Sequence, residues 1–182
     1  MADDGAMGVH VALLRSINVG KANRISMHDL RAVFEDLGCT DVRTYIQSGN
    51  VVFGAPAREV QGLAGRVEKA LAAAHGIEVP VILRTGDELR AVTAANPFPR
   101  AELAARHVVF LRDAPQGPDP LAALDPASHA PLEMALVGRE LHLMAPEGMA
   151  RVKLTNAKMD RAFGTATTTR NGRTVSKVIA ML

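Results

Sequence analysis

One pair of segments occurs twice in this chain of 182 residues. HVALLR at residues 10–15 returns as HVVFLR at residues 107–112, and both read as buried strands. RTGDELRAV at residues 84–92 returns as RNGRTVSKV at residues 170–178, and each reads as a strand end, a glycine turn and a helix. Because both segments recur in the same order, the chain is expected to fold as two copies of one unit.

The first half predicts the order βαββαβ. Ser26 and Asp29 have the spacing of a capping box at the start of a helix. A turn at Gln47-Ser48-Gly49-Asn50 predicts a hairpin, because Gly and Asn tolerate positive φ. The expected elements are a strand at 9–15, a helix from Ser26 to Gly38, a hairpin at 41–55, a helix ended by Gly76 and a strand at 79–85.

The second half predicts the same order, with a strand at 106–113, a short helix near Asp119–Leu124, a hairpin at 132–145, a helix at about 155–163 and a strand at 165–170. The fold expected is therefore α+β: a tandem duplication of two ferredoxin-like βαββαβ units, each followed by an extra helix. Exchange of strands between the halves is an open alternative. The expected boundaries are a loose N-terminal arm at 1–6, a first unit at 7–95, a linker at 96–105 and a second unit at 106–182.

Composition excludes several classes of protein. A formal net charge of +2 is too small to indicate nucleic-acid binding, and aromatic residues at 3% are too few for an RNA-stacking sheet. One cysteine forms no internal disulfide, and the 6 histidines lack metal-ligand spacing, so neither a metal nor another cofactor is expected. The acidic N-terminus is unlike a signal peptide and no apolar run is long enough for a membrane helix, which favours a cytoplasmic protein without membrane contact.

A cationic, amide-rich stretch follows the first expected strand. No acid occurs from Gly5 to His28, and the following helix start favours anions through its free N–H groups and dipole. The spacing is not that of a phosphate-binding Walker loop. Two interpretations are open, an anion site and a solvated turn built by asparagines. The residues concerned are Arg15, Asn18, Lys21, Asn23 and Arg24.

Two further groups of polar residues are candidates for ligand binding. Gln47, Ser48 and Asn50 lie in the hairpin turn after Tyr45, where they either orient a ligand or, as turn propensity favours, satisfy the turn backbone. No acid follows Asp160, and Arg170 and Asn171 stand beside hydroxyl residues at a strand end, a setting suited to phosphate or carboxylate. These residues make one basic cleft only if the two stretches meet.

Longer motifs resemble a known family. VALLRSINVGKANRISMHDLRAVFEDLG, then VRTYIQSGNVVF, and later NPF and TTRNGRTVSK, are similar to the domain-of-unknown-function family DUF1697 over almost the whole chain. The resemblance implies a small intracellular α+β protein built by duplication, of uncharacterised function. The family pattern Arg-Asn-Trp-Asn-Thr-Val is matched here except that Gly172 and Arg173 replace its aromatic and amide residues.

The leading functional hypothesis is a binding protein whose basic, amide-lined surface takes an anionic small molecule or nucleic-acid phosphate. An enzyme acting on a phosphorylated or nucleotide-like metabolite is one alternative, with Tyr45 or His28 as acid or base. No nucleophile elbow, His–Asp pair or paired carboxylates are visible, so a conventional enzyme is not indicated. The other alternative is an interaction module that forms a homodimer rather than a monomer through its sheet edges.

Overall fold

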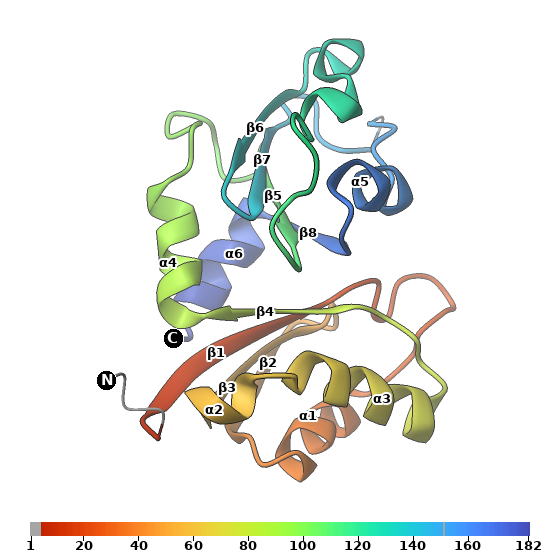
Figure 1. The fold of residues 1–182 in the computed structure, drawn as a ribbon, viewed down its shortest axis with the longest axis vertical. Helices are drawn as coiled ribbons and strands as arrows, with labels where there is room; N and C mark the ends of the chain where they lie inside the picture. The colour runs from red at the N-terminus through yellow and green to blue at the C-terminus, as the bar shows by residue number, and fades with distance from the viewer. Residues whose placement is uncertain (1–4, 151) are drawn as a thin grey trace. The chain divides into compact units, whose positions relative to one another are not determined.

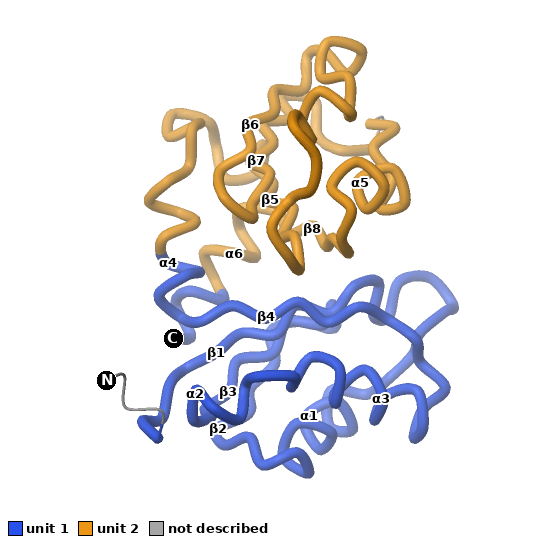
Figure 2. The backbone as a smooth tube through the Cα atoms, viewed as in Figure 1, with its two compact units in different colours: residues 1–90, 178–182 blue, residues 91–177 orange. Residues whose placement is uncertain are grey.

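The computed structural model describes residues 5–150 and 152–182. The chain forms two compact units, coloured separately in Figure 2. One unit runs to Arg90 and includes Val178–Leu182, and the other comprises Ala91–Lys177. Each unit has its own four-stranded sheet and its own apolar core.

The expected boundaries, a first unit at 7–95 and a second at 106–182, are a proposal about which parts of the chain fold separately. The compact units of the structure do not test it. The division into compact units falls inside the helix after each sheet, α4 (Gly86–Ala94) and α6 (Gly172–Ile179). Separate folding of residues 7–95 and 106–182 therefore stays a proposal. Of the expected N-terminal arm, residues 1–4 lie outside the described part of the chain.

The first unit is an antiparallel sheet in the order β2-β3-β1-β4, with helices on one face (Figure 1). Its elements follow the predicted order βαββαβ, with one short helix after the hairpin that was not predicted, and α4 is the expected extra helix. The elements are β1 (Met7–Leu14), α1 (Met27–Asp36), β2 (Thr40–Tyr45), β3 (Asn50–Pro56), α2 (Ala57–Val60), α3 (Leu63–His75) and β4 (Val81–Thr85). This order and pairing are those of a ferredoxin-like fold.

One helix of this unit shows how local sequence and packing agree. Leu30 and Phe34 of α1 are fully buried, and the ring of Phe34 lies 5.3 Å from that of Phe53 on β3. Their spacing of four residues places both on one helix face, against the sheet. At the N-terminus, Ser26 Oγ accepts a hydrogen bond from the Asp29 N–H at 3.0 Å and donates one to its carboxylate at 2.8 Å. The predicted start of this helix is confirmed.

The second unit repeats the topology, with sheet order β6-β7-β5-β8. Its elements are β5 (Arg106–Leu111), the 3₁₀ turns η1 (Ala122–Leu124) and η2 (Pro126–His129), β6 (Glu133–Val137), β7 (Glu140–Met144), α5 (Asn156–Phe163), β8 (Thr167–Asn171) and then α6. The predicted tandem duplication of two ferredoxin-like units is confirmed. Within the described residues, every helix is too short or too polar to cross a bilayer.

The first helical segment of the second unit is short, as the sequence predicts. A short helix is expected near Asp119–Leu124, and the structure has the 3₁₀ helix η1 there, followed by the 3₁₀ helix η2. Pro126 lacks the N–H group that would be needed to continue the first of them as an α-helix. Asp125 between the two turns has φ 51°, which also ends a right-handed helix.

The strand registers show that the sequence repeat occupies equivalent positions in the two sheets. Arg84 of β4 pairs with Val11 of β1, and Arg170 of β8 pairs with Val108 of β5. Both arginines are buried, with exposed fractions of 2% and 8%. Each donates to the carbonyl of the residue before it, at 2.8 Å for Arg84 and 2.9 Å for Arg170. The two copies therefore keep a buried arginine at the same place in the sheet.

His142 of β7 is a buried titratable group. It is 1% exposed, and neither ring nitrogen has a hydrogen-bond partner among the described residues. Burial lowers its pKa below the ordinary value of 6.5, because the imidazolium form would lose its hydration. Burial also lowers the pKa of the partly buried His107 on β5.

The protein is expected to lose stability as the pH falls below about 6.5, and His142→Leu is expected to flatten that loss. The unfolded chain takes up a proton at the ordinary histidine pKa, whereas folded His142 stays neutral until the pH reaches its lowered pKa. Stability is therefore complete above the unfolded value and declines in that window. Urea unfolding at about pH 8 and about pH 5 measures the difference.

Leu143→Val is the control, since this neighbour of His142 does not titrate. It is expected to lower the free energy of unfolding by about 1 kcal/mol at both pH values. Some loss of stability at low pH should remain in His142→Leu, because burial lowers the pKa of His107 as well. An unchanged pH dependence in His142→Leu would contradict the assignment.

Candidate functional site

Two loops of the first unit meet at one end of its sheet. The main-chain N–H of Leu14 donates to the carbonyl of Gly49 at 2.8 Å, which joins the end of β1 to the turn between β2 and β3. We call residues 15–25 and 46–49 the basic loop cluster. It brings together the cationic stretch and the polar turn that the sequence marked as separate candidates.

The amides of the longer loop hold the loop itself. Asn18 Nδ2 donates to the Ile25 carbonyl at 2.9 Å, and Asn18 Oδ1 accepts from the Ile25 N–H at 3.0 Å. Asn23 Nδ2 donates to the Ser16 carbonyl at 3.3 Å. Both asparagines have positive φ, 55° and 50°, a conformation that asparagine adopts more readily than most residues. Asn18 and Asn23 therefore fix the shape of the loop.

The hairpin turn is held in a similar way by Asn50. This side chain is fully buried, and its Nδ2 donates to the Tyr45 carbonyl at 3.2 Å and to Ser48 Oγ at 2.8 Å. The left-handed residues of the turn are Ile46 (φ 48°) and Gly49 (φ 70°), so the predicted hairpin forms with the glycine, and not Asn50, at positive φ. Ile46 is β-branched, and its backbone is strained there.

The charged side chains of the cluster differ in how far they are exposed. Lys21 and Arg24 are exposed, as is the neutral Gln47, whereas Arg15 and Tyr45 are half-buried. The N-terminus of α1 already has a carboxylate in its first turn, that of Asp29. Any anion binding at this surface must therefore come from the lysine and arginine side chains rather than from the helix dipole.

Arg170 and Asn171 belong to the other compact unit. Arg170 Nη1 donates to Thr168 Oγ1 at 2.8 Å as well as to Thr169, and burial lowers the pKa of its guanidinium to about 10. Asn171 Oδ1 accepts from the Thr174 N–H at 2.8 Å and so caps the start of α6. In the structure, these contacts tie Arg170 and Asn171 to β8 and α6.

Gly172 lies under another segment of the second unit. A Cβ atom added to Gly172 would be 2.7 Å from the Leu103 carbonyl oxygen and 3.3 Å from Arg106 Cβ. The main chain around Leu103 thus occupies the space beside this position. Arg106 holds that segment through hydrogen bonds to the carbonyls of Ala101 and Pro99, each 2.6 Å long.

His28 and Tyr45, the residues considered as acid or base, lie on α1 and β2. His28 is exposed on the first turn of α1. Cys39 is buried, and burial raises the pKa of its thiol, which keeps it protonated. No group of three or more His, Cys, Asp or Glu residues that could hold a metal ion occurs within the described residues.

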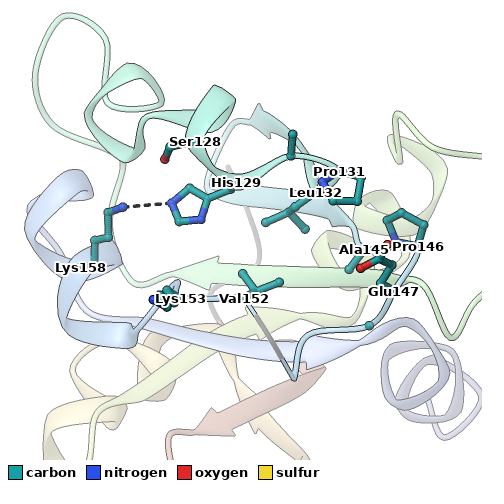
Figure 3. Close-up of a pocket in the computed structure, with 12 residues that line it drawn as sticks. Ser128, His129, Pro131, Leu132, Ala145, Pro146, Glu147, Val152, Lys153 and Lys158 are labelled. Atoms are coloured by element: carbon teal, nitrogen blue, oxygen red, sulfur yellow. Dashed lines mark hydrogen bonds between the residues drawn. The ribbon is translucent and has the colours of Figure 1, made fainter.

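A cavity in the second unit contains charged residues that the sequence did not mark. It has a volume of about 520 Å³, and Lys158 Nζ lies 3.0 Å from His129 Nε2 at its edge (Figure 3). These two residues come from different elements, η2 and α5. No motif spacing links them, so only the folded chain brings them together.

Fold and site together define a duplicated ferredoxin-like protein whose first copy carries a basic loop cluster and whose second copy does not. Residues 7–142 match the model of the family described as "Protein of unknown function (DUF1697)". The chain therefore belongs to the DUF1697 family, as its motifs indicate. The match includes all of the basic loop cluster.

Among solved structures, the chain is similar to the conserved bacterial protein SP0830 from Streptococcus pneumoniae. The two share 24% sequence identity with a TM-score of 0.69, over 97% of this chain and 99% of that one. At this identity the likeness shows a common fold. The comparison with curated proteins gives no match.

Proposed function

We propose that the protein binds a phosphate-bearing ligand, an anionic small molecule or a nucleic-acid backbone, at the basic loop cluster. One observation carries the proposal. Asn18 and Asn23 form hydrogen bonds within the cluster and so fix the longer loop, and Lys21 and Arg24 are exposed on that same loop. A loop held in one conformation loses little entropy when a ligand binds, so its cations are prepared for an anion.

The charge around these cations also supports an anionic ligand. No acid occurs between Gly5 and His28, and the next acid, Asp29, accepts a hydrogen bond from Ser26. Exposed ion pairs are weak and screened by salt, so a single contact of this kind contributes little. Binding here requires both cations to act on one phosphate, and it is expected to weaken as the salt concentration rises.

Two apolar side chains complete the ligand surface. Val19 is 64% exposed and Ile46 is 52% exposed, on the two loops that meet. Their exposure provides an apolar contact for the body of a ligand whose phosphate lies at Lys21 and Arg24. Neither is aromatic, so stacking of bases is not part of the proposed mode.

The test compares two double variants of the first unit. Lys21→Ala/Arg24→Ala removes the cations of the cluster, and Arg58→Ala/Lys69→Ala removes the same charge from exposed positions on α2 and α3. Fluorescence anisotropy with a labelled single-stranded oligonucleotide gives the affinity over a range of salt concentrations. The cluster variant is expected to bind about tenfold more weakly, with a salt dependence reduced by about two ions.

Competition with a nucleoside monophosphate and with inorganic phosphate distinguishes an anionic small molecule from a nucleic-acid backbone as the ligand. If they displace the oligonucleotide and stabilise the folded chain, the ligand is a small molecule or the phosphate alone. If they do neither while the oligonucleotide binds, the ligand is a nucleic-acid backbone. Equal weakening by both double variants would mean that only net charge matters, and that result would contradict the proposal.

A further inference from the structure

The second unit contains a cavity whose lining differs in kind from the basic loop cluster. About 520 Å³ in volume, it is lined by residues of η2, the end of the β6–β7 hairpin, the segment before α5 and α5 itself (Figure 3). Small-molecule sites commonly have volumes of about 300–1,000 Å³. The space therefore suits a small metabolite, and its lining residues all lie in the second unit, apart from the basic loop cluster of the first.

One end of the cavity is cationic. Lys158 extends from the first turn of α5 towards His129, and its Nζ lies 3.0 Å from His129 Nε2 (Figure 3). An ammonium group only donates, so His129 Nε2 is the acceptor in this contact. Within the described residues His129 takes one of the three N–H donors of Lys158, and the other two are those proposed to meet a ligand. Lys153 also lines the cavity.

The middle of the cavity is apolar and its other end is acidic. Leu132 and Ala145 are buried, with exposed fractions of 6% and 2%, and Val152 lies beside them in the lining. Glu147 stands next to Pro146, at the opposite end from Lys158 in Figure 3. A ligand that spans the cavity would thus have an anionic head, a short hydrocarbon body and no negative charge at its tail.

We propose that this cavity binds a small aliphatic monocarboxylate, with the carboxylate at Lys158. Among the described lining residues, two lysines and one glutamate leave a net charge of +1 (2 − 1), which neutralises a monoanion but not a phosphate dianion. The apolar lining takes the hydrocarbon chain. Glu147 repels a second carboxylate, so it selects monocarboxylates over dicarboxylates of the same length.

The test uses the full chain and three six-carbon probes: hexanoate, adipate and hexanol. Amide chemical shifts in ¹⁵N-labelled protein report both affinity and location. Hexanoate is expected to give saturable shifts at residues 128–132 and 145–150, and to bind about tenfold more tightly than adipate or hexanol. Shifts that do not saturate, or that lie outside these residues, would overturn the proposal.

Three variants assign the selectivity to named side chains. Lys158→Met keeps the length of the side chain and is expected to weaken hexanoate binding about tenfold, whereas Lys177→Met on α6 should leave it unchanged. Glu147→Gln is expected to bring adipate close to hexanoate. Unchanged hexanoate binding in Lys158→Met, or unchanged discrimination in Glu147→Gln, would refute the assigned roles. Because these residues lie in the second unit, failure here leaves the basic loop cluster untouched.

Discussion

Phe34→Ala is expected to lower the free energy of unfolding by about 3–5 kcal/mol, the range for removing a fully buried phenylalanine. Phe34 is 0% exposed in the core between α1 and the sheet of the first unit, and its ring packs on Phe53. The truncation removes most of the apolar surface of this side chain and leaves a cavity that neighbouring side chains refill only in part. Denaturant unfolding followed by circular dichroism measures the change.

Phe98→Ala is the matched control, since Phe98 is only partly buried and its truncation exposes less new surface. It is expected to cost less than half as much as Phe34→Ala. A loss below about 1 kcal/mol for Phe34→Ala would contradict its place in the core.

Hydrogen exchange on Phe34→Ala also tests the proposed folding units. If residues 7–95 and 106–182 fold separately, the amides of β1 and β3 exchange faster while those of β5 and β7 keep their protection. Equal acceleration in both sheets would show one cooperative unit and would sink the proposed boundaries.

Gly49→Ala is expected to cost about 3 kcal/mol and to disturb the basic loop cluster. Gly49 has φ 70°, and an added Cβ would lie 2.8 Å from Leu14 Cβ and 3.2 Å from Ile17 Cγ1. The left-handed conformation alone costs about 1–2 kcal/mol for alanine, and overpacking against these side chains adds about 1–3 kcal/mol. The free energy of unfolding and the amide spectra of residues 15–25 give the two readouts.

Gly62→Ala is the control that separates the cost of the left-handed backbone from the cost of the steric contacts. Gly62 has φ 71°, almost the same as Gly49, but an added Cβ would meet nothing within 4 Å. It is expected to cost only the conformational part, about 1–2 kcal/mol. Equal costs for the two variants would mean that the contact of the turn with Leu14 and Ile17 is not tight.

The parts of the fold that were predicted well are those with local causes. Ser26 and Asp29 marked the start of α1, and Gly76 marked the end of α3. The recurrence of HVALLR as HVVFLR indicated the duplication, which the registers of β1 and β5 confirm. Helix caps and strand periodicity depend on neighbours in sequence, so they are visible without the folded chain.

Some local details were not predicted. The short helix expected near Asp119–Leu124 is the 3₁₀ helix η1, and the second 3₁₀ helix η2 follows it without having been predicted. Ile46 adopts positive φ although β-branched residues avoid it, and Asn50 forms part of the strand instead. In the turn, the hydrogen bonds from buried Asn50 to Tyr45 and Ser48 override the propensity of the single residues.

The sequence by itself determined the family, the α+β class, the duplication and the region where cations and amides gather. Only the tertiary structure decided what those residues do: Asn18 and Asn50 hold loops, Arg170 is buried in a sheet, and Lys158 meets His129. The physical reason is that burial and hydrogen-bond partners come from segments far apart in the chain. Such contacts form together on folding, and no short stretch of sequence specifies them.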